Sequence, residues 1–184
     1  MGITIHFQGR LRDRADVGRL VEEVADIART LHWRRRTVDG DLKGIRFHPH
    51  PDCEPVALLF DSGGRLRNPL LAGTDESGVC FVKTQFAPVE VHIAIVKLFR
   101  HLKKRYFSEF TVTDEGDYWE SGDRRVLEEK IAFLAEKIEE VGRRIAGVRT
   151  EPGDSAEDLV ERIERCLSEM DDGPDRSPGR GPER

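Results

Sequence analysis

With 184 residues, 38% hydrophobic and 35% charged, the chain suits one domain plus a tail, and its apolar residues are clustered enough to build a core. The net charge of −5 argues against a nucleic-acid binder that acts through bulk positive charge, because such a protein must attract phosphate. No stretch approaches the roughly 20 apolar residues of a membrane span, and no apolar run marks a signal peptide. Three cysteines far apart form no disulfide framework, so we expect free thiols in a reducing cytoplasm.

The first part of the chain carries signals for strands, a helix and a hairpin. Residues 3–8 alternate apolar and polar side chains, which predicts a half-buried strand. Residues 15–31 repeat apolar positions at steps of three and four, which predicts an amphipathic helix. Two further strands are expected at 44–48 and 55–61. The sequence DSGG at 61–64 then provides the glycine that a tight hairpin turn requires.

The middle of the chain predicts a central packing helix between two strands. Residues 79–86 have the composition of a strand. Pro88 suits the first turn of a helix, because the N–H that proline lacks would be unpaired there. This helix is expected to continue to about residue 107 with a wide apolar face, and residues 109–113 follow as another strand. The acidic segment after that strand is expected to be a loop.

The order of these elements predicts an α+β fold of two layers, with a mainly antiparallel sheet and helices on one face. We expect this domain to occupy residues 1–122. The alternation of the strands also predicts a polar second face of the sheet, which is wet or meets a partner. The residues expected on that face are Thr4, His6, Gln8, Arg46, His48, Thr111 and Thr113.

The C-terminal part of the chain predicts a helical hairpin and a disordered tail. Apolar residues between 124 and 145 recur at steps of four and three, which is a heptad seam. A second amphipathic helix follows to about residue 170. We expect a helical segment at 123–170, with contacts to a second copy or to a protein partner through 124–170; packing of both helices on their own sheet is the alternative. Residues 171–184 contain too few apolar side chains to offset the entropy that a chain loses on folding, so we expect them to form a disordered tail.

His48, His50 and Cys53 are the candidate metal ligands. Two histidines two apart in an extended chain leave on the same side, about 7 Å apart at the backbone, so both imidazoles can reach one Zn²⁺. Cys53 supplies a third ligand after the turn. The spacing H-x-H-x-x-C matches no strong zinc motif, however, and Pro49 and Pro51 explain an extended strand exit without a metal. On that second interpretation no cofactor is expected.

The acidic loop after the strand at 109–113 holds the candidate catalytic residues. Carboxylates in this position can bind Mg²⁺ or Ca²⁺, or act as an acid and base pair. Their spacing does not match an EF-hand, and Asp123 is well placed to cap the next helix. Trp119 either fills the edge of the core or forms the lip of a binding site. The candidates are Asp114, Glu115, Asp117, Tyr118 and Glu120.

Three hypotheses about function follow. The sequence has no nucleophile elbow, Walker loop or dinucleotide-binding glycine pattern, so the first hypothesis is an intracellular interaction or regulatory domain without catalytic activity. It would bind a protein partner or itself. The second is a metal-dependent, hydrolase-like enzyme that uses His48, His50 and the carboxylates of 114–120. The third is binding of an anion or nucleic acid through the basic segments 33–36 and 100–105, if the two segments meet.

Overall fold

The computed structural model describes residues 2–71, 74, 77–146, 155–157, 160–162, 164 and 165. The chain forms two compact units, one that ends at Ala132 and one that begins at Phe133. The first unit combines antiparallel strands with helices, which confirms the α+β class. In the described residues, no helix is both long enough and apolar enough to cross a bilayer.

The strands of the described residues form two antiparallel sheets of three strands each. In the first sheet β1 lies between β5 and β6, and in the second β3 lies between β2 and β4. The strands are β1 (Thr4–Leu11), β2 (Arg34–Asp39), β3 (Lys43–His48), β4 (Val56–Phe60), β5 (Cys80–Lys83) and β6 (Phe107–Asp114). The antiparallel pairing agrees with the sequence, which did not indicate that the strands divide between two sheets.

The hairpin expected at 61–64 is present and connects the two sheets. Gly64 has a φ of +75°, a left-handed conformation that favours glycine, and its N–H donates to the Asp61 carbonyl at 2.9 Å. The chain then returns along β4, where Leu66 bridges to Phe60. The N–H of Leu66 also donates to the carbonyl of Gly9 in β1 at 2.9 Å. One short segment therefore holds both sheets side by side.

The strand β2 was not predicted from the sequence. Five of its six residues are exposed, so it lacks the alternation of apolar and polar residues that marks a half-buried strand. It lies at the edge of its sheet and pairs with β3 along its whole length, from Arg34 opposite His48 to Asp39 opposite Lys43. Pairing with a buried neighbour, rather than its own apolar content, holds this strand in place.

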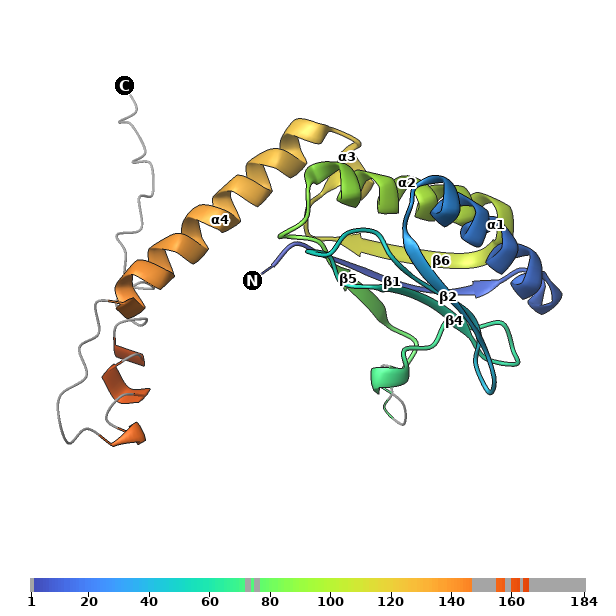
Figure 1. The fold of residues 1–184 in the computed structure, drawn as a ribbon, viewed down its shortest axis with the longest axis horizontal. Coiled ribbons are helices and arrows are strands. Elements are labelled where there is room, and N and C mark those ends of the chain that lie inside the picture. Colours follow the sequence, from blue (N-terminus) through green and yellow to red (C-terminus); the bar gives the residue numbers. More distant parts are fainter. Residues whose placement is uncertain are drawn as a thin grey trace, which may run out of the picture. The chain divides into compact units, whose positions relative to one another are not determined.

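The helices α1 and α2 cover one side of the strands (Figure 1). This arrangement agrees with the expected two layers. The short helix α3 occupies part of the segment that was expected to be a loop. The helices are α1 (Val17–Thr30), α2 (Val89–Tyr106), α3 (Tyr118–Ser121) and α4 (Arg124–Ala146), with short 3-10 turns at Arg14–Asp16 and Pro69–Leu71.

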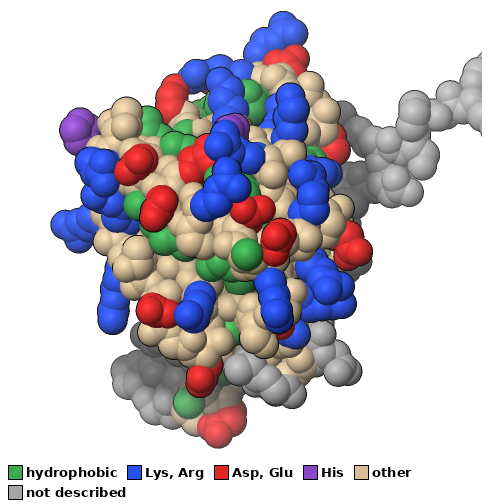
Figure 2. Space-filling model, turned by 90° about the vertical axis from the view of Figure 1, so that its right-hand side faces the viewer, with side chains coloured by type: hydrophobic (Ala, Val, Ile, Leu, Met, Phe, Trp, Pro, Cys, Tyr) green, Lys and Arg blue, Asp and Glu red, His purple; other side chains and the backbone are tan. Residues whose placement is uncertain are grey.

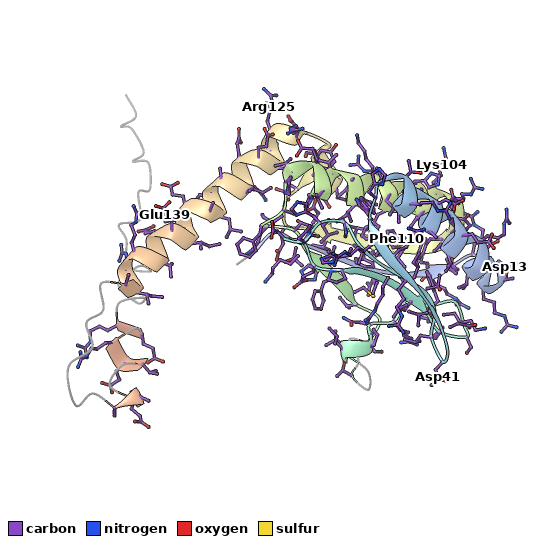
Figure 3. The ribbon with its side chains drawn as sticks, in the orientation of Figure 1. Asp13, Asp41, Lys104, Phe110, Arg125 and Glu139 are labelled. Atoms are coloured by element: carbon purple, nitrogen blue, oxygen red, sulfur yellow. The ribbon has the colours of Figure 1, made fainter. Side chains whose placement is uncertain are left out.

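Aromatic side chains fill the space between α2 and the first sheet. Phe99 of α2 contacts Phe7 of β1, with ring centroids 4.6 Å apart, and meets Phe110 of β6 edge to face at 5.7 Å. Phe110 points from the strand toward α2 (Figure 3). Phe7 and Phe99 are almost completely buried. Such pairs add about 0.5–1.5 kcal/mol beyond the burial of their area, so this cluster anchors α2 on the sheet.

The helix α4 belongs partly to the first unit. Leu127 is completely buried there, and Arg124 forms an ion pair with Glu90 of α2 at 2.6 Å. For that reason the first unit extends to Ala132, beyond the expected boundary at residue 122. Most of the second expected helix and the whole tail at 171–184 lie outside the described residues, so the hairpin stays a prediction.

Candidate functional site

Three polar side chains form a hydrogen-bonded chain in the interior. His92 Nδ1 lies 2.8 Å from Thr84 Oγ1, within hydrogen-bond distance. On the other side of the ring, His92 Nε2 donates a hydrogen bond to Asp114 Oδ2 at 3.1 Å. The side chains of His92 and Asp114 are 1% and 0% exposed, and Thr84 is equally buried. A hydroxyl, an imidazole and a carboxylate in series resemble a catalytic triad in composition. All three side chains are buried, so this hydrogen-bonded chain is closed to solvent in this structure.

Asp114 is ionised in this interior position. Burial raises the pKa of its carboxyl group, but hydrogen bonds from His92 and from the backbone N–H groups of Trp119 and Gly116 outweigh burial and leave the pKa below its ordinary value. Those two backbone bonds measure 2.9 and 2.8 Å. The side chain expected to be catalytic therefore fixes the turn that leads into α3. The sequence feature that could have pointed to this buried contact is His92, a single histidine on the most apolar predicted helix.

The other candidate catalytic residues do not converge. Glu115 accepts a hydrogen bond from the backbone N–H of Thr4 at 2.8 Å, and Asp117 pairs with Lys130. Tyr118 is buried with its ring edge-on to His92, so it fills the core. Glu120 is exposed. These carboxylates point to different partners, so the acidic segment forms no acid and base pair.

The three candidate metal ligands are each engaged within their own turn. His48 Nε2 donates to the Cys53 carbonyl at 2.6 Å, and His50 Nδ1 accepts from the N–H of Asp52 at 3.2 Å. Burial, with Glu54 alongside, raises the pKa of the Cys53 thiol to about 12, and its Sγ donates to the Glu54 carbonyl at 3.2 Å. Among the described residues, no three His, Cys, Asp or Glu side chains are grouped to hold a metal ion. The histidines are thus not joined to the 114–120 carboxylates.

The two basic segments also find separate surroundings. On α2, Arg100 donates to the Tyr118 carbonyl at 3.1 Å. Its guanidinium group also lies over the ring of Trp119, so this ring packs against a positive charge of α2. His101 and Arg105 both pair with Glu23 of α1. Lys104 points outward from α2 (Figure 3).

In the segment 33–36, Trp33 stacks on Phe47 in the core, with ring centroids 5.4 Å apart. The three arginines that follow lie on β2. Within the part of the chain that the structure describes, no hydrogen bond or ion pair joins them to the 100–105 segment. That the two segments form one basic patch stays a prediction.

The side of the sheets that α1 and α2 leave uncovered carries most of the polar residues predicted for it. His6 lies opposite Thr113 and Gln8 lies opposite Thr111, and all four are at least partly exposed. Thr4 is the exception, because it is 7% exposed. We call this surface the open face. It comprises His6, Gln8, Arg10, Arg36, Arg46, Arg65, Phe81, Glu109, Thr111 and Thr113.

Two pairs of arginines lie directly opposite each other on the open face. Arg36 of β2 is the register partner of Arg46 of β3, and Arg10 of β1 bridges to Arg65. Side chains in such positions have Cβ atoms about 4.5–5.5 Å apart, and like charges there are destabilising. Within the described residues none of these four guanidinium groups makes an ion pair or a hydrogen bond. Glu109 of β6 is also a register partner of Arg10 and lines the same surface, so this pair has an acidic neighbour. Among the described residues, no acidic residue lies opposite Arg36 or Arg46 in the strand register.

Each arginine pair borders a hollow. The hollow beside Arg46 has a volume of about 320 Å³, and Phe81, Leu70 and Glu54 contribute to its wall. The hollow beside Arg10 and Arg65 has a volume of about 240 Å³. Phe81 lies opposite His6 on the neighbouring strand, with ring centroids 6.3 Å apart. Because His6 and Arg10 share one side of β1, the two hollows lie along a single surface.

On other parts of the described surface, basic and acidic groups are mixed (Figure 2). On the side shown in Figure 2, Lys and Arg side chains are interspersed with Asp and Glu. Next to the open face, Arg67 is neutralised by Asp61 at 2.8 Å. Other described cations, such as Lys97, Lys103 and Lys104 of α2, also make no ion pair, so the two arginine pairs are distinguished by their opposed positions in the strand register.

The chain matches no protein-family model, no curated protein and no solved structure. What the protein does has therefore to follow from its own surface chemistry. The buried chain around His92 is closed to ligands, whereas the open face is accessible and charged. The open face is for that reason the candidate functional site.

Proposed function

We propose that the first unit is a binding domain without catalytic activity, and that its open face receives an anionic partner. The observation that carries this proposal is the pairing of Arg36 with Arg46, neither of which makes an ion pair among the described residues. Arg10 and Arg65 form a second opposed pair, with Glu109 on the other side of Arg10. The engagement of Asp114, Glu115 and the turn residues around His48 in structural hydrogen bonds supports a role other than catalysis.

An anion bound between opposed arginines changes the energetics of the pair. Like charges directly opposite each other in a sheet destabilise the pair. A guanidinium group offers several N–H donors in one plane, which match the oxygens of a phosphate or carboxylate. The bound anion replaces repulsion with charge-assisted hydrogen bonds on both sides. The face is therefore at its most favourable when occupied.

Retention on immobilised heparin, a polyanion, tests this proposal at neutral pH and low ionic strength. The net charge of −5 opposes retention, so binding to the column requires a local basic surface. We expect the wild-type protein to be retained and the double variant Arg36→Glu/Arg46→Glu to pass through. The matched control is Lys97→Glu/Lys104→Glu, which makes the same charge change at two exposed positions of α2. Equal loss in both variants, or a wild-type protein that is not retained, contradicts the proposal.

A second proposal concerns the C-terminal part of the chain: we propose self-association or contact with a protein partner through residues 124–170. The observation in its favour is a set of exposed apolar side chains along α4: Phe133, Ile138 and Ile145 are 57%, 44% and 38% exposed. Ile138 and Ile145 are seven apart, as in a heptad seam, so a second copy of the helix offers them a matching surface.

We propose that the protein resides in a reducing compartment such as the cytoplasm. Cys53 and Cys80 are free and buried, and burial raises the pKa of each thiol to about 12. Such thiols stay protonated and contribute to the core as small apolar groups. This arrangement supports a protein that does not depend on disulfides.

A further inference from the structure

We infer that the anionic partner of the open face is a single-stranded nucleic acid, an inference that rests on the proposed function. Its first support is the exposed aromatic ring of Phe81 on β5. This ring is 38% exposed, although it lies on an otherwise polar sheet surface beside His6. An apolar ring in this place gains by being covered. A nucleobase covers it well, because stacking needs only a flat face and tolerates any base.

The second support is the position of the cations around this ring. Phe81 and Arg46 line the same hollow, and the side chains of His6, Gln8 and Arg10 lead along β1 from the ring to the second hollow. Lys83, two residues beyond Phe81 on the same face of β5, is exposed. Arg46 and Lys83 therefore lie near the exposed ring, together with one carboxylate, that of Glu54, which lines the same hollow. An extended strand of nucleotides presents phosphates that suit these cations and bases that suit this ring.

The combination favours single-stranded nucleic acid over the other polyanions. An acidic peptide would neutralise the arginines but offers no flat ring for Phe81. A duplex hides the faces of its bases inside the stack. Its grooves are read by helices or two-stranded ribbons, whereas the open face is a broad sheet surface bordered by hollows of about 240 and 320 Å³. An aromatic ring on a sheet with nearby arginines suits unpaired bases.

Fluorescence anisotropy with a labelled single-stranded oligonucleotide of about 12 nucleotides tests the inference, a length within the range of about 4–16 that one small β domain covers. Replacement of Phe81 by Ala removes the stacking surface, and we expect binding to weaken by about 5- to 150-fold. The matched control is Phe86→Ala, which removes another exposed phenyl ring just after β5. Both residues are exposed, so both variants are expected to fold, which circular dichroism checks.

The salt dependence separates the arginines from the aromatic ring. Each phosphate that the protein neutralises adds about 0.7 to the steepness of the plot of log K against log salt for a single strand. We therefore expect Arg46→Ala to flatten this plot by about that amount, and Phe81→Ala to leave its slope unchanged. A duplex of the same sequence and a poly-glutamate peptide, added as competitors, are expected to displace the oligonucleotide poorly.

The outcomes distinguish the inference from the proposed function. If Arg46→Ala weakens binding but Phe81→Ala does not, or if poly-glutamate competes as well as the oligonucleotide, the face binds anions without reading bases and the inference fails alone. Preference for the duplex overturns the inference in the same way. If neither the oligonucleotide nor heparin binds the wild-type protein, the proposed function itself is contradicted.

Discussion

His92 Nε2 and Asp114 Oδ2 lie 3.1 Å apart, in a position where their side chains are 1% and 0% exposed. This pair joins α2 to the end of β6, and the backbone N–H of Trp119 bonds to the same carboxylate oxygen. A buried carboxylate depends on its donors, because water does not replace them. The stability of the first unit is therefore sensitive to this contact.

Replacing His92 with Leu is expected to lower the free energy of unfolding by about 3–5 kcal/mol, because it leaves the Asp114 charge buried without its partner. Urea denaturation followed by circular dichroism measures the change. His101→Leu on the same helix is the control, since its bond to Glu23 is exposed and such pairs contribute at most about 1 kcal/mol. A loss below about 1 kcal/mol for the His92 variant would show that the buried pair is dispensable.

The lowered pKa of Asp114 makes stability depend on pH in the acid range. Its folded pKa lies below its unfolded value, so the unfolded state binds the proton more readily. The stabilisation is complete above the unfolded pKa of about 4 and is lost as the pH falls through the folded pKa. We expect the free energy of unfolding to decline below about pH 4, and to decline less steeply in Asp114→Asn. The control Asp41→Asn, at an exposed turn, is expected to keep the wild-type slope.

Gly44 lies where the second sheet leaves no room for a side chain. A Cβ at this position would lie 1.9 Å from the Leu58 carbonyl oxygen, which is backbone and cannot rotate away. We expect Gly44→Ala to reduce the free energy of unfolding by at least about 2 kcal/mol, within the range for overpacked sites. Gly40→Ala is the control, because nothing lies within 4 Å of its added Cβ. Equal melting temperatures of the two variants would contradict the close approach.

Self-association through α4 predicts that the full-length protein is a dimer in light scattering at tens of micromolar. Ile138→Glu places a charge on the exposed apolar side of the helix and is expected to produce a monomer. The neighbouring substitution Glu139→Gln, at an exposed position, is expected to leave the dimer intact. A monomeric wild-type protein at this concentration would rule out the dimer.

The elements that could be predicted from sequence are those with one buried side. β1 and β6 alternate because Ile5, Phe7, Phe110 and Val112 face the core while their neighbours face water. The helix α1 shows its apolar spacing for the same reason, with Leu20, Val24 and Ala28 buried. β2 escaped prediction because an edge strand of exposed residues carries no such period. The spacing of apolar residues predicts an element only when that element has one buried side. It does not predict a strand such as β2, which is held in place by pairing with its neighbour.

The sequence by itself determined the α+β class, the hairpin at 61–64 and the polar character of one sheet face, because each depends on the spacing of neighbouring residues. Only the tertiary structure decided which polar residues meet. His92 and Asp114 are 22 positions apart, and Arg10 reaches Arg65 across the join between the sheets. Asp114, which the sequence had suggested as a catalytic residue, is buried and closed to solvent. The opposed arginines stayed in water, since strand register is set by the apolar side chains on the other face.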